Sequence, residues 1–300
     1  MTGLRRTVVF GLGRVGTSVA LRLRAQGALH GAWTRSSERA QALRERWEVE
    51  EFAHAWPDHA SLAGAGLLLF CVPDDALQRC IEALPADVKA RNDLCWLHSS
   101  GVRGVEPFRD AGVVGPVGTW HPLYAFPSDP DHVSAEGAFF ALSGDPPAVM
   151  VAEALVALFG GASGLVPDEA RAAYHLAAVI AGNGVYGLLW SAQQILERAG
   201  VHSEDLQRGM ALLAAQSAGA VGRDGLEAAM TGPFARGDAS TVLRHRTLMR
   251  SGDSGQERLY LGLAAPWLAL ARARGLADDK VAALESVLAD WESASVTQDR

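Results

Sequence analysis

The 300-residue sequence predicts an α/β domain with a doubly wound parallel sheet, followed by an all-helical domain. Three observations support this prediction. A glycine-rich turn joins a strand pattern to a helix pattern near the start of the chain, strands and helices alternate as far as Val166, and strand patterns end from Pro167 onward. We therefore expect residues 1–166 to form the α/β domain and residues 167–300 to form the helical one.

The glycine-rich turn has the spacing of a dinucleotide-binding loop. The apolar run Val8 to Phe10 predicts a strand, and a helix pattern follows the glycines. Gly11 permits the turn, Gly13 lets the backbone approach a pyrophosphate, and Gly16 allows the helix to pack closely on the strand. The phosphates would then lie on unpaired amides at the start of the helix. The residues expected to bind the dinucleotide here are Gly11, Leu12, Gly13, Arg14, Val15 and Gly16; a plain glycine-rich turn is the alternative.

The end of the second predicted strand, Ala28 to Trp33, indicates which dinucleotide is preferred. An acidic residue at this point would hold a ribose 2′-hydroxyl and favour NAD, but the chain reads Thr34, Arg35, Ser36. A guanidinium beside hydroxyls suits a 2′-phosphate. We therefore expect NADP rather than NAD, with a merely solvated Arg35 as the alternative.

The other predicted strands place polar residues along one edge of the sheet. Apolar runs at Gly66–Val72, Leu94–His98 and Val113–Thr119 read as buried strands, with a short strand at Val49–Phe52 and further strands at Phe139–Ser143 and Ser163–Val166. Ligands of such sheets lie beyond the carboxyl ends of the strands. The residues expected to complete the cofactor site from these ends are Cys71, Val72, Pro73, Ser99 and Ser100.

Helix patterns cover residues 168–200, 204–221, 239–250, 255–274 and 277–292. Ala172 to Leu196 carries no Asp, Glu, Lys or Arg and is long enough to cross a bilayer. It nevertheless holds His175, Asn183 and Gln193, which are costly in lipid. We expect a helix buried inside the helical domain and no membrane partner.

Charge and residue composition argue against several classes of function. The net charge is −7 without basic blocks, so nucleic-acid binding is not expected. The three cysteines form no CxxC pair and their number is odd, and no cationic leader is apparent, which predicts reduced thiols in a cytoplasmic protein. The scattered histidines predict no metal site, and the absence of GxSxG argues against a serine hydrolase.

Four side chains are candidates for the chemistry of a hydride transfer, which needs a proton donor. His175 as acid/base and Asn183 as an orienting group are eight positions apart, so on one helix they differ by about 80° and face the same cleft. His121, after a strand at the rim, is a second acid/base candidate, and Arg236 could clamp an anionic substrate. Buried core roles for the first pair, and a turn role for His121, remain the alternatives. His98 reads as structural, and Asp238 as a helix N-cap.

Several motifs together resemble the Rossmann-like proteins that carry a DUF2520 domain, relatives of pyrroline-5-carboxylate reductase, ketopantoate reductase and the β-hydroxyacid dehydrogenases. They are Gly11 to Gly16, Val72-Pro-Asp74, His98-Ser-Ser-Gly101, His121-Pro122 with Phe126, Tyr174 to Ala178 with Asn183, and Thr231 to Asp238 with His245. The resemblance implies a Rossmann domain, a helical domain like the carboxy-terminal one of 6-phosphogluconate dehydrogenase, and a homodimer built on the helical domains. It implies no substrate. If Asn183 matches the conserved Asn of the β-hydroxyacid dehydrogenases, Val179 stands where they carry a catalytic Lys.

These observations favour an NADP-dependent oxidoreductase that acts on a small, anionic carbonyl, imine or hydroxy compound between the domains. The missing Lys leaves a second interpretation open, in which the protein binds NADP without turnover, as a sensor or regulatory subunit.

Overall fold

The computed structural model describes residues 4–249 and 254–295. The chain divides into two compact units, one ending at Asn183 and the other beginning at Gly184. The first unit carries the sheet and the second is helical, as the sequence predicts. The predicted boundary at Val166 coincides with the end of the last strand, but the first unit continues through the next helix, because the buried Arg171 at the start of that helix is bonded to the sheet.

In the described part of the chain, eight strands form one sheet in the order β3-β2-β1-β4-β5-β6-β7-β8. Their bounds are β1 Thr7–Phe10, β2 Leu29–Trp33, β3 Phe52–Ala53, β4 Leu67–Phe70, β5 Cys95–His98, β6 Val117–Leu123, β7 Phe139–Gly144 and β8 Ala162–Leu165. The first six are parallel and have the order 3-2-1-4-5-6 of a doubly wound dinucleotide-binding fold. Their carboxyl ends therefore meet at one edge of the sheet.

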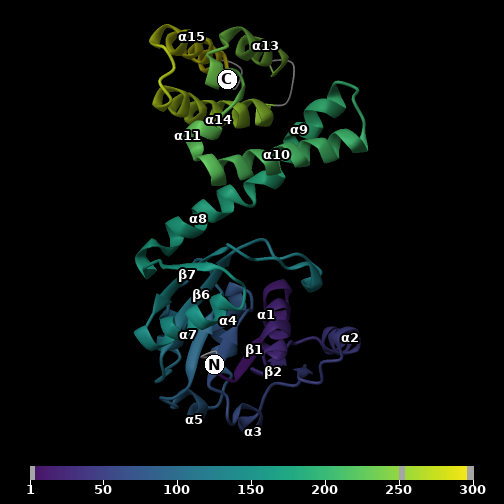
Figure 1. Ribbon diagram of the computed structural model, residues 1–300, viewed down its shortest axis with the longest axis vertical. Helices are drawn as coiled ribbons and strands as arrows, with labels where there is room; N and C mark the ends of the chain where they lie inside the picture. Colours follow the sequence, from purple (N-terminus) through teal and green to yellow (C-terminus); the bar gives the residue numbers. More distant parts are fainter. Residues whose placement is uncertain (1–3, 250–253, 296–300) are drawn as a thin grey trace. The chain divides into compact units, whose positions relative to one another are not determined.

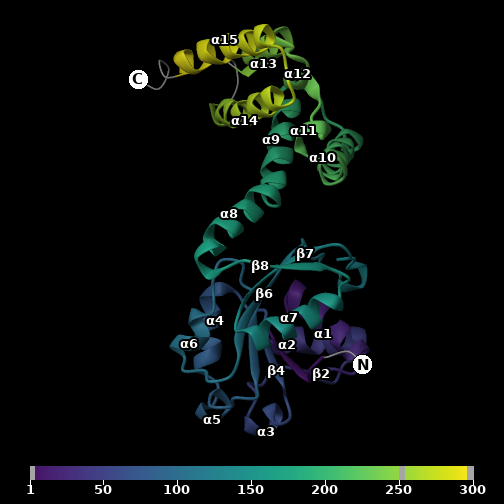
Figure 2. The same cartoon turned by 60° about the vertical axis from the view of Figure 1, so that its left-hand side comes forward.

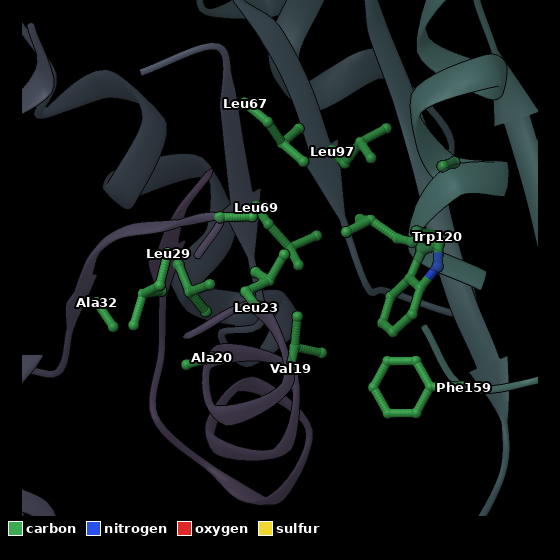
Figure 3. Close-up of a cluster of buried hydrophobic side chains, with 14 of the residues drawn as sticks. Val19, Ala20, Leu23, Leu29, Ala32, Leu67, Leu69, Leu97, Trp120 and Phe159 are labelled. Atoms are coloured by element: carbon green, nitrogen blue, oxygen red, sulfur yellow. The ribbon is translucent and has the colours of Figure 1, made fainter. Parts of the chain in front are cut away.

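Helices cover both faces of this sheet (Figure 1). They are α1 Arg14–Ala25, α2 Ser37–Trp47, α3 His59–Leu62, α4 Asp74–Glu82, α5 Ala86–Lys89, α6 Glu106–Asp110 and α7 Pro146–Ala157, and α8 Arg171–Ala181 follows the last strand. One core contains α1 and α7 with Trp120 and Phe159, as Figure 3 shows, and the other contains α4 and α6 with Trp96 and Phe108. Because β1, β4 and β5 are buried on both faces, they read as continuous apolar runs in the sequence.

The sixth strand differs from the prediction. The expected strand Val113–Thr119 is found at Val117–Leu123, so His121 and Pro122 lie inside β6 and not in a turn after it. Gly112 adopts a φ of 75°, and Gly115 packs against the Leu94 carbonyl, so the chain before Val117 turns. From Gly118 to Leu123 the strand pairs antiparallel with β7, which makes the far end of the sheet mixed where a wholly parallel sheet was expected.

The helical unit contains α9 Gly184–Arg198, α10 Glu204–Asp224, α11 Leu226–Ala229, α12 Gly232–Arg236, α13 Ala239–Met249, α14 Ser254–Ala273 and α15 Asp278–Ser295 (Figure 2). Its core includes Phe234, Val242, Leu268 and Leu284. The predicted helix over residues 239–250 ends at Met249 within the described residues, and position 250 lies outside them. The predicted N-cap is confirmed, since the Asp238 carboxylate accepts hydrogen bonds from the amide and hydroxyl of Thr241 at 3.0 and 2.7 Å.

The predicted continuous helix over 168–200 is wrong. A 3₁₀ turn at Asp168–Ala170 leads into α8, which ends at Ala181, and α9 begins at Gly184 after a turn at Gly182 and Asn183.

The stretch Asp168–Arg198 is long enough to cross a membrane and contains an 18-residue window with a mean hydropathy of 1.3; one such helix is weak evidence for a membrane span. Its most apolar window is not buried within the chain. Leu176, Ile180, Tyr186 and Trp190 are exposed, because no described part of the chain covers these side chains. The expectation of a helix buried by the chain itself is therefore wrong.

Candidate functional site

The glycine loop has the geometry that a pyrophosphate requires. Gly11 adopts a φ of 91°, which favours glycine, and Gly16 packs so closely that an added Cβ would lie 1.8 Å from the Gly11 carbonyl oxygen. A Cβ on Gly13 would meet nothing within 4 Å, so the backbone there faces open space. Gly13 is the N-cap of α1, and the first turn of that helix contains no acidic residue. The loop and helix start therefore form a cradle that fits an anionic diphosphate.

The cradle opens on a cavity of about 680 Å³, a size typical of ligand sites. Eleven of the fourteen residues predicted to bind the cofactor line it: Gly11, Leu12, Gly13, Arg14, Val15, Thr34, Arg35, Cys71, Val72, Pro73 and Ser99. Gly16 does not line the cavity because it packs against the Gly11 carbonyl. The side chain of Leu12 is 3% exposed and belongs to the core, so this residue offers its backbone.

Ser36 and Ser100 do not line the cavity, because local backbone groups occupy their hydroxyls. The Ser36 hydroxyl caps α2 by accepting a hydrogen bond from the Arg39 amide at 3.1 Å. The Ser100 hydroxyl accepts one from the Arg103 amide at 3.1 Å, and the side chain is buried. Ser99 thus remains the serine that faces the cavity at the end of β5.

Eight further residues line the cavity. They are Phe10, Trp33, His54, Trp56, Asp75, Ala76, Arg79 and Cys80. Burial raises the pKa of the Cys80 thiol, and the nearby positive charges of Arg79 and Arg35 oppose that rise. Arg35 and Arg79 thus both line the cavity and both act on Cys80, where a single guanidinium was predicted. Asp75, Ala76, Arg79 and Cys80 are spaced as one face of a helix, which is the sequence signal that would have identified them.

A buried polar network joins α8 to the ends of β5, β6 and β7. The Arg171 side chain is fully buried; its guanidinium donates to the Ser100 carbonyl at 3.3 Å, to the Ser143 hydroxyl at 3.3 Å, and to the Thr119 hydroxyl. Asp168 balances the charge 3.7 Å away and accepts a hydrogen bond from Ser143 at 2.7 Å. This network fixes the first turn of α8 against the rim, since a buried charge must be paired and hydrogen-bonded.

The network places two side chains of α8 against His121. Nδ1 of His121 lies 2.8 Å from the Tyr174 hydroxyl oxygen, and the His175 ring centre lies 6.2 Å from that of His121. Gly101 makes this approach possible: an added Cβ there would lie 2.6 Å from the His175 ring and 2.7 Å from Nε2 of His121. Because His121 and Thr119 alternate with Trp120 along β6, they share the face of the sheet on which α8 begins.

Burial sets the charge of these groups. It lowers the pKa of His121 to about 4, helped by the positive charge of Arg171, and it raises the pKa of Tyr174 above its usual range. His121 is therefore neutral at pH 7, and Tyr174 carries its proton. The pair is uncharged and hydrogen-bonded, which suits proton exchange with a ligand oxygen or nitrogen.

His98 has the structural role that the sequence suggested. Its Nε2–H donates to the Gly104 carbonyl at 2.6 Å, and its Nδ1 accepts from the Ser100 amide at 3.2 Å. Burial lowers its pKa to about 4. Both ring nitrogens thus hold the turn that follows β5.

The other two catalytic candidates are Asn183, which follows α8, and Arg236, which belongs to the helical unit. His175 lies on α8, and Asn183 lies in the two-residue turn between α8 and α9. Arg236 is exposed in the helical unit, where its carbonyl accepts a hydrogen bond from Lys280 at 3.3 Å. Sequence reasoning missed Tyr174 and Arg171 as site residues. Their signal is slight: Tyr174 adjoins His175, and Arg171 is the last charged residue before a long uncharged stretch.

Two protein families match this chain. Residues 4–122 match the family described as Rossmann-like domain, and residues 138–266 match the family described as domain of unknown function (DUF2520). A comparison with curated proteins found no match.

Several solved structures have a similar fold. Protein TM1727 from Thermotoga maritima is 22% identical with a TM-score of 0.70, and the match covers 89% of this chain and 99% of that one. The imine reductase from Pseudomonas sp. is 17% identical with a TM-score of 0.61, and the match covers 95% of this chain and 100% of that one. The reductive aminase from Aspergillus terreus in complex with NADPH and ethyl-5-oxohexanoate is 20% identical with a TM-score of 0.56. This match covers 96% of this chain and 93% of that one. Similarity at these identities shows a shared two-domain fold. The chain consists of a Rossmann-like domain followed by a domain of the DUF2520 family.

Proposed function

We propose that this chain is an NADP-dependent oxidoreductase that transfers hydride to or from a small carbonyl, imine or hydroxy compound. The observation that carries the proposal is the cavity that begins at the glycine cradle and reaches Ser99 at the end of β5. Two residues further along the chain, Gly101 contacts His121 beside Tyr174. A diphosphate site and an uncharged proton-exchanging pair therefore lie along one rim of one unit.

NADP is the cofactor that we propose, because Arg35 and Arg79 line the cavity and residues 34–37 carry no carboxylate. Asp75 is the acidic residue in the lining, and it lies at the start of α4 and not at the end of β2. The reductive aminase of similar fold was crystallised with NADPH, which supports this choice. When bound, the nicotinamide would supply or accept the hydride.

Tyr174 is the proposed proton donor for the product oxygen or nitrogen. In the tautomer that carries a proton on Nδ1, His121 donates to the Tyr174 oxygen, so the phenol O–H is directed to the substrate. Once this proton leaves, the Nδ1 proton restores the phenol while Nε2 takes one from solvent. His121 thus stays uncharged overall. His175, beside the same ring, is proposed to orient the substrate.

Substrate identity is proposed at the level of class. The imine reductase and the reductive aminase of similar fold bind imines and oxo compounds by their names, which supports a carbonyl or imine. Arg236 is proposed to bind an anionic group of the substrate, and Asn183 is proposed to orient the substrate.

The competing proposal is a sensor that binds NADP without turnover. If Asn183 matches the Asn of the β-hydroxyacid dehydrogenases, Val179 stands where they carry a catalytic Lys, and this favours the sensor. A screen of NADPH oxidation with small oxo-acids and cyclic imines separates the two. Turnover that falls at least about tenfold in Tyr174→Phe, with KM for NADPH unchanged, supports the oxidoreductase. A cofactor that raises Tm while no compound oxidises it supports the sensor.

We also propose a homodimer. Leu176 and Ile180 of α8 are 61% and 67% exposed, and Tyr186 and Trp190 of α9 are 68% and 62% exposed. Exposed apolar side chains one helical turn apart, as Leu176 and Ile180 are on α8 and Tyr186 and Trp190 are on α9, mark a protein interface more often than a free surface. Sedimentation equilibrium should give twice the chain mass of 31.7 kDa, and replacing Ile180 with Glu should shift the protein to monomer.

A further inference from the structure

Several arginines around the cofactor cavity are bonded to the protein itself. The Arg39 guanidinium donates to the carbonyl of Leu12 at 3.3 Å, and that of Arg103 donates to the carbonyl of Asp74 at 3.5 Å. Arg103 also forms an ion pair with Glu106 at 3.3 Å. These two guanidiniums hold the backbone beside the starts of α1 and α4, so their hydrogen bonds serve the fold.

Arg35 and Arg79 have no such partners. Both line the cavity, and within residues 4–249 and 254–295 neither guanidinium forms a hydrogen bond or an ion pair. Asp75, one helical turn before Arg79, also lines the cavity, but its carboxylate does not pair with the Arg79 guanidinium. Two guanidiniums thus line the cavity with their N–H donors available to a ligand.

The geometry of α4 directs Arg79 to the cavity. Leu77 and Ile81 are buried against the sheet, whereas Asp75, Arg79 and Cys80 line the cavity. This division follows from the helical period, since positions 75, 76, 79 and 80 share one face of the helix. Because its other face is buried, α4 presents Arg79 from a fixed backbone.

The two positive charges act on the same side chain. Burial raises the pKa of the Cys80 thiol, and the charges of Arg79 and Arg35 both oppose that rise. Like charges that lie near one another repel, and no carboxylate in the described part of the chain is paired with either of them. An anion between the two guanidiniums would offset this repulsion and accept hydrogen bonds from both.

The 2′-phosphate is the part of NADP that such a site fits. A phosphate monoester carries about two negative charges near neutral pH and has three terminal oxygens, so it can accept hydrogen bonds from two guanidiniums at once. The diphosphate of the same cofactor would lie elsewhere, on the amides that follow Gly13. NAD has no 2′-phosphate, so its binding would gain nothing from this pair of arginines.

We propose that Arg79 is a specificity-determining residue for NADP: the 2′-phosphate binds between Arg35 and Arg79, beside Cys80. The sequence identifies Arg35 by its place at the end of β2, whereas Arg79 lies on α4, two strands further along the chain. This inference rests on the proposed cofactor, and it adds α4 to the elements that discriminate between NADP and NAD.

Calorimetry of NADPH and NADH binding, without substrate, tests this assignment. Arg79→Ala places a good helix former at an exposed position, so the fold should be retained. We expect the variant to bind NADPH about tenfold or more weakly and to bind NADH as the wild type does, because only the 2′-phosphate loses hydrogen bonds. Arg79→Lys keeps the charge without the planar fork and should lose less. The control is Arg44→Ala, exposed on α2 and outside the cavity lining, which should change neither affinity.

The double variant Arg35→Ala with Arg79→Ala should bind the two nucleotides with about equal affinity. An unchanged NADPH affinity in Arg79→Ala overturns the proposal, and so do equal losses for NADPH and NADH, which would place Arg79 at another part of the cofactor. Either result leaves the proposed oxidoreductase standing as long as the wild type binds NADPH. A wild type that binds no pyridine nucleotide overturns both.

A matched pair of variants at Cys80 tests the place of the phosphate from a neighbouring side chain. Asp and Asn have nearly the same shape and differ in charge. A carboxylate beside the two guanidiniums would pair with them and repel the phosphate, so Cys80→Asp should bind NADPH about tenfold more weakly than Cys80→Asn. The two variants should bind NADH within about twofold of each other. Equal NADPH affinities overturn the proposal, and the Arg79 variants decide it if a substitution at the half-buried Cys80 unfolds the protein.

Discussion

Acidification from pH 7 to pH 5 should destabilise the sheet-bearing unit, and His121 accounts for a defined share of the effect. Burial lowers the pKa of His121 from 6.5 to about 4. Below pH 6.5 the unfolded chain therefore binds a proton that the folded chain does not, so the free energy of unfolding falls as pH drops towards 4 and then levels off. A shift of this size corresponds to about 3 kcal/mol in full, of which about 2 kcal/mol is lost between pH 7 and pH 5.

Urea unfolding at pH 7 and pH 5, followed by the fluorescence of the buried Trp96 and Trp120, measures this loss. In His121→Gln the titrating ring is gone, so the fall in unfolding free energy between the two pH values should be about 2 kcal/mol smaller than in wild type. His98, whose pKa is also lowered to about 4, remains in the variant and still contributes to the pH dependence of the unfolding free energy. An unchanged pH dependence in His121→Gln would refute the assigned burial and neutrality of this histidine.

Four further substitutions test other parts of the site. Arg35→Ala should weaken NADPH binding about 10- to 100-fold and leave NADH binding unchanged by calorimetry, whereas equal losses for both would remove Arg35 from the 2′-phosphate site. Gly16→Ala places a Cβ 1.8 Å from the Gly11 carbonyl oxygen and should cost at least about 2 kcal/mol in urea unfolding. Arg171→Met leaves the buried hydroxyls beneath α8 without their donor and should cost about 3 to 5 kcal/mol; a stable variant would contradict the network. Tyr174→Phe should lower kcat and leave Tm within about 2 °C of wild type, whereas unchanged kcat would dismiss the phenol as proton donor.

The sheet and the cofactor cradle could be predicted from sequence because both depend on local signals. Continuous apolar runs predict buried strands. The spacing of Gly11, Gly13 and Gly16 predicts a dinucleotide-binding loop because it lies between a strand pattern and a helix pattern. The register of β6 could not be predicted in this way. It depends on antiparallel pairing with β7, which lies further along the chain. This pairing produces no recognisable hydrophobic pattern within Val113–Leu123.

The candidate proton-exchanging pair illustrates the same limit. His121 was identifiable as a titratable residue near a strand end, but its partner Tyr174 is 53 residues away, and only the anchoring of α8 by Arg171 brings them together. The interruption between α8 and α9 at Gly182 and Asn183 could not be predicted either, because the uncharged run reads as one helix. Propensity alone does not resolve a break inside a long apolar stretch.

Calorimetry of NADPH binding to the wild type and to Gly13→Ala tests the central claim most directly. A Cβ at position 13 meets no atom within 4 Å, so the variant should fold with an unchanged Tm, but its methyl would occupy the space of the diphosphate. We predict saturable NADPH binding to the wild type and a loss of at least about tenfold in affinity in the variant. No heat from any pyridine nucleotide with the wild type, or equal affinity in the two proteins, would contradict a dinucleotide held by the amides at the start of α1.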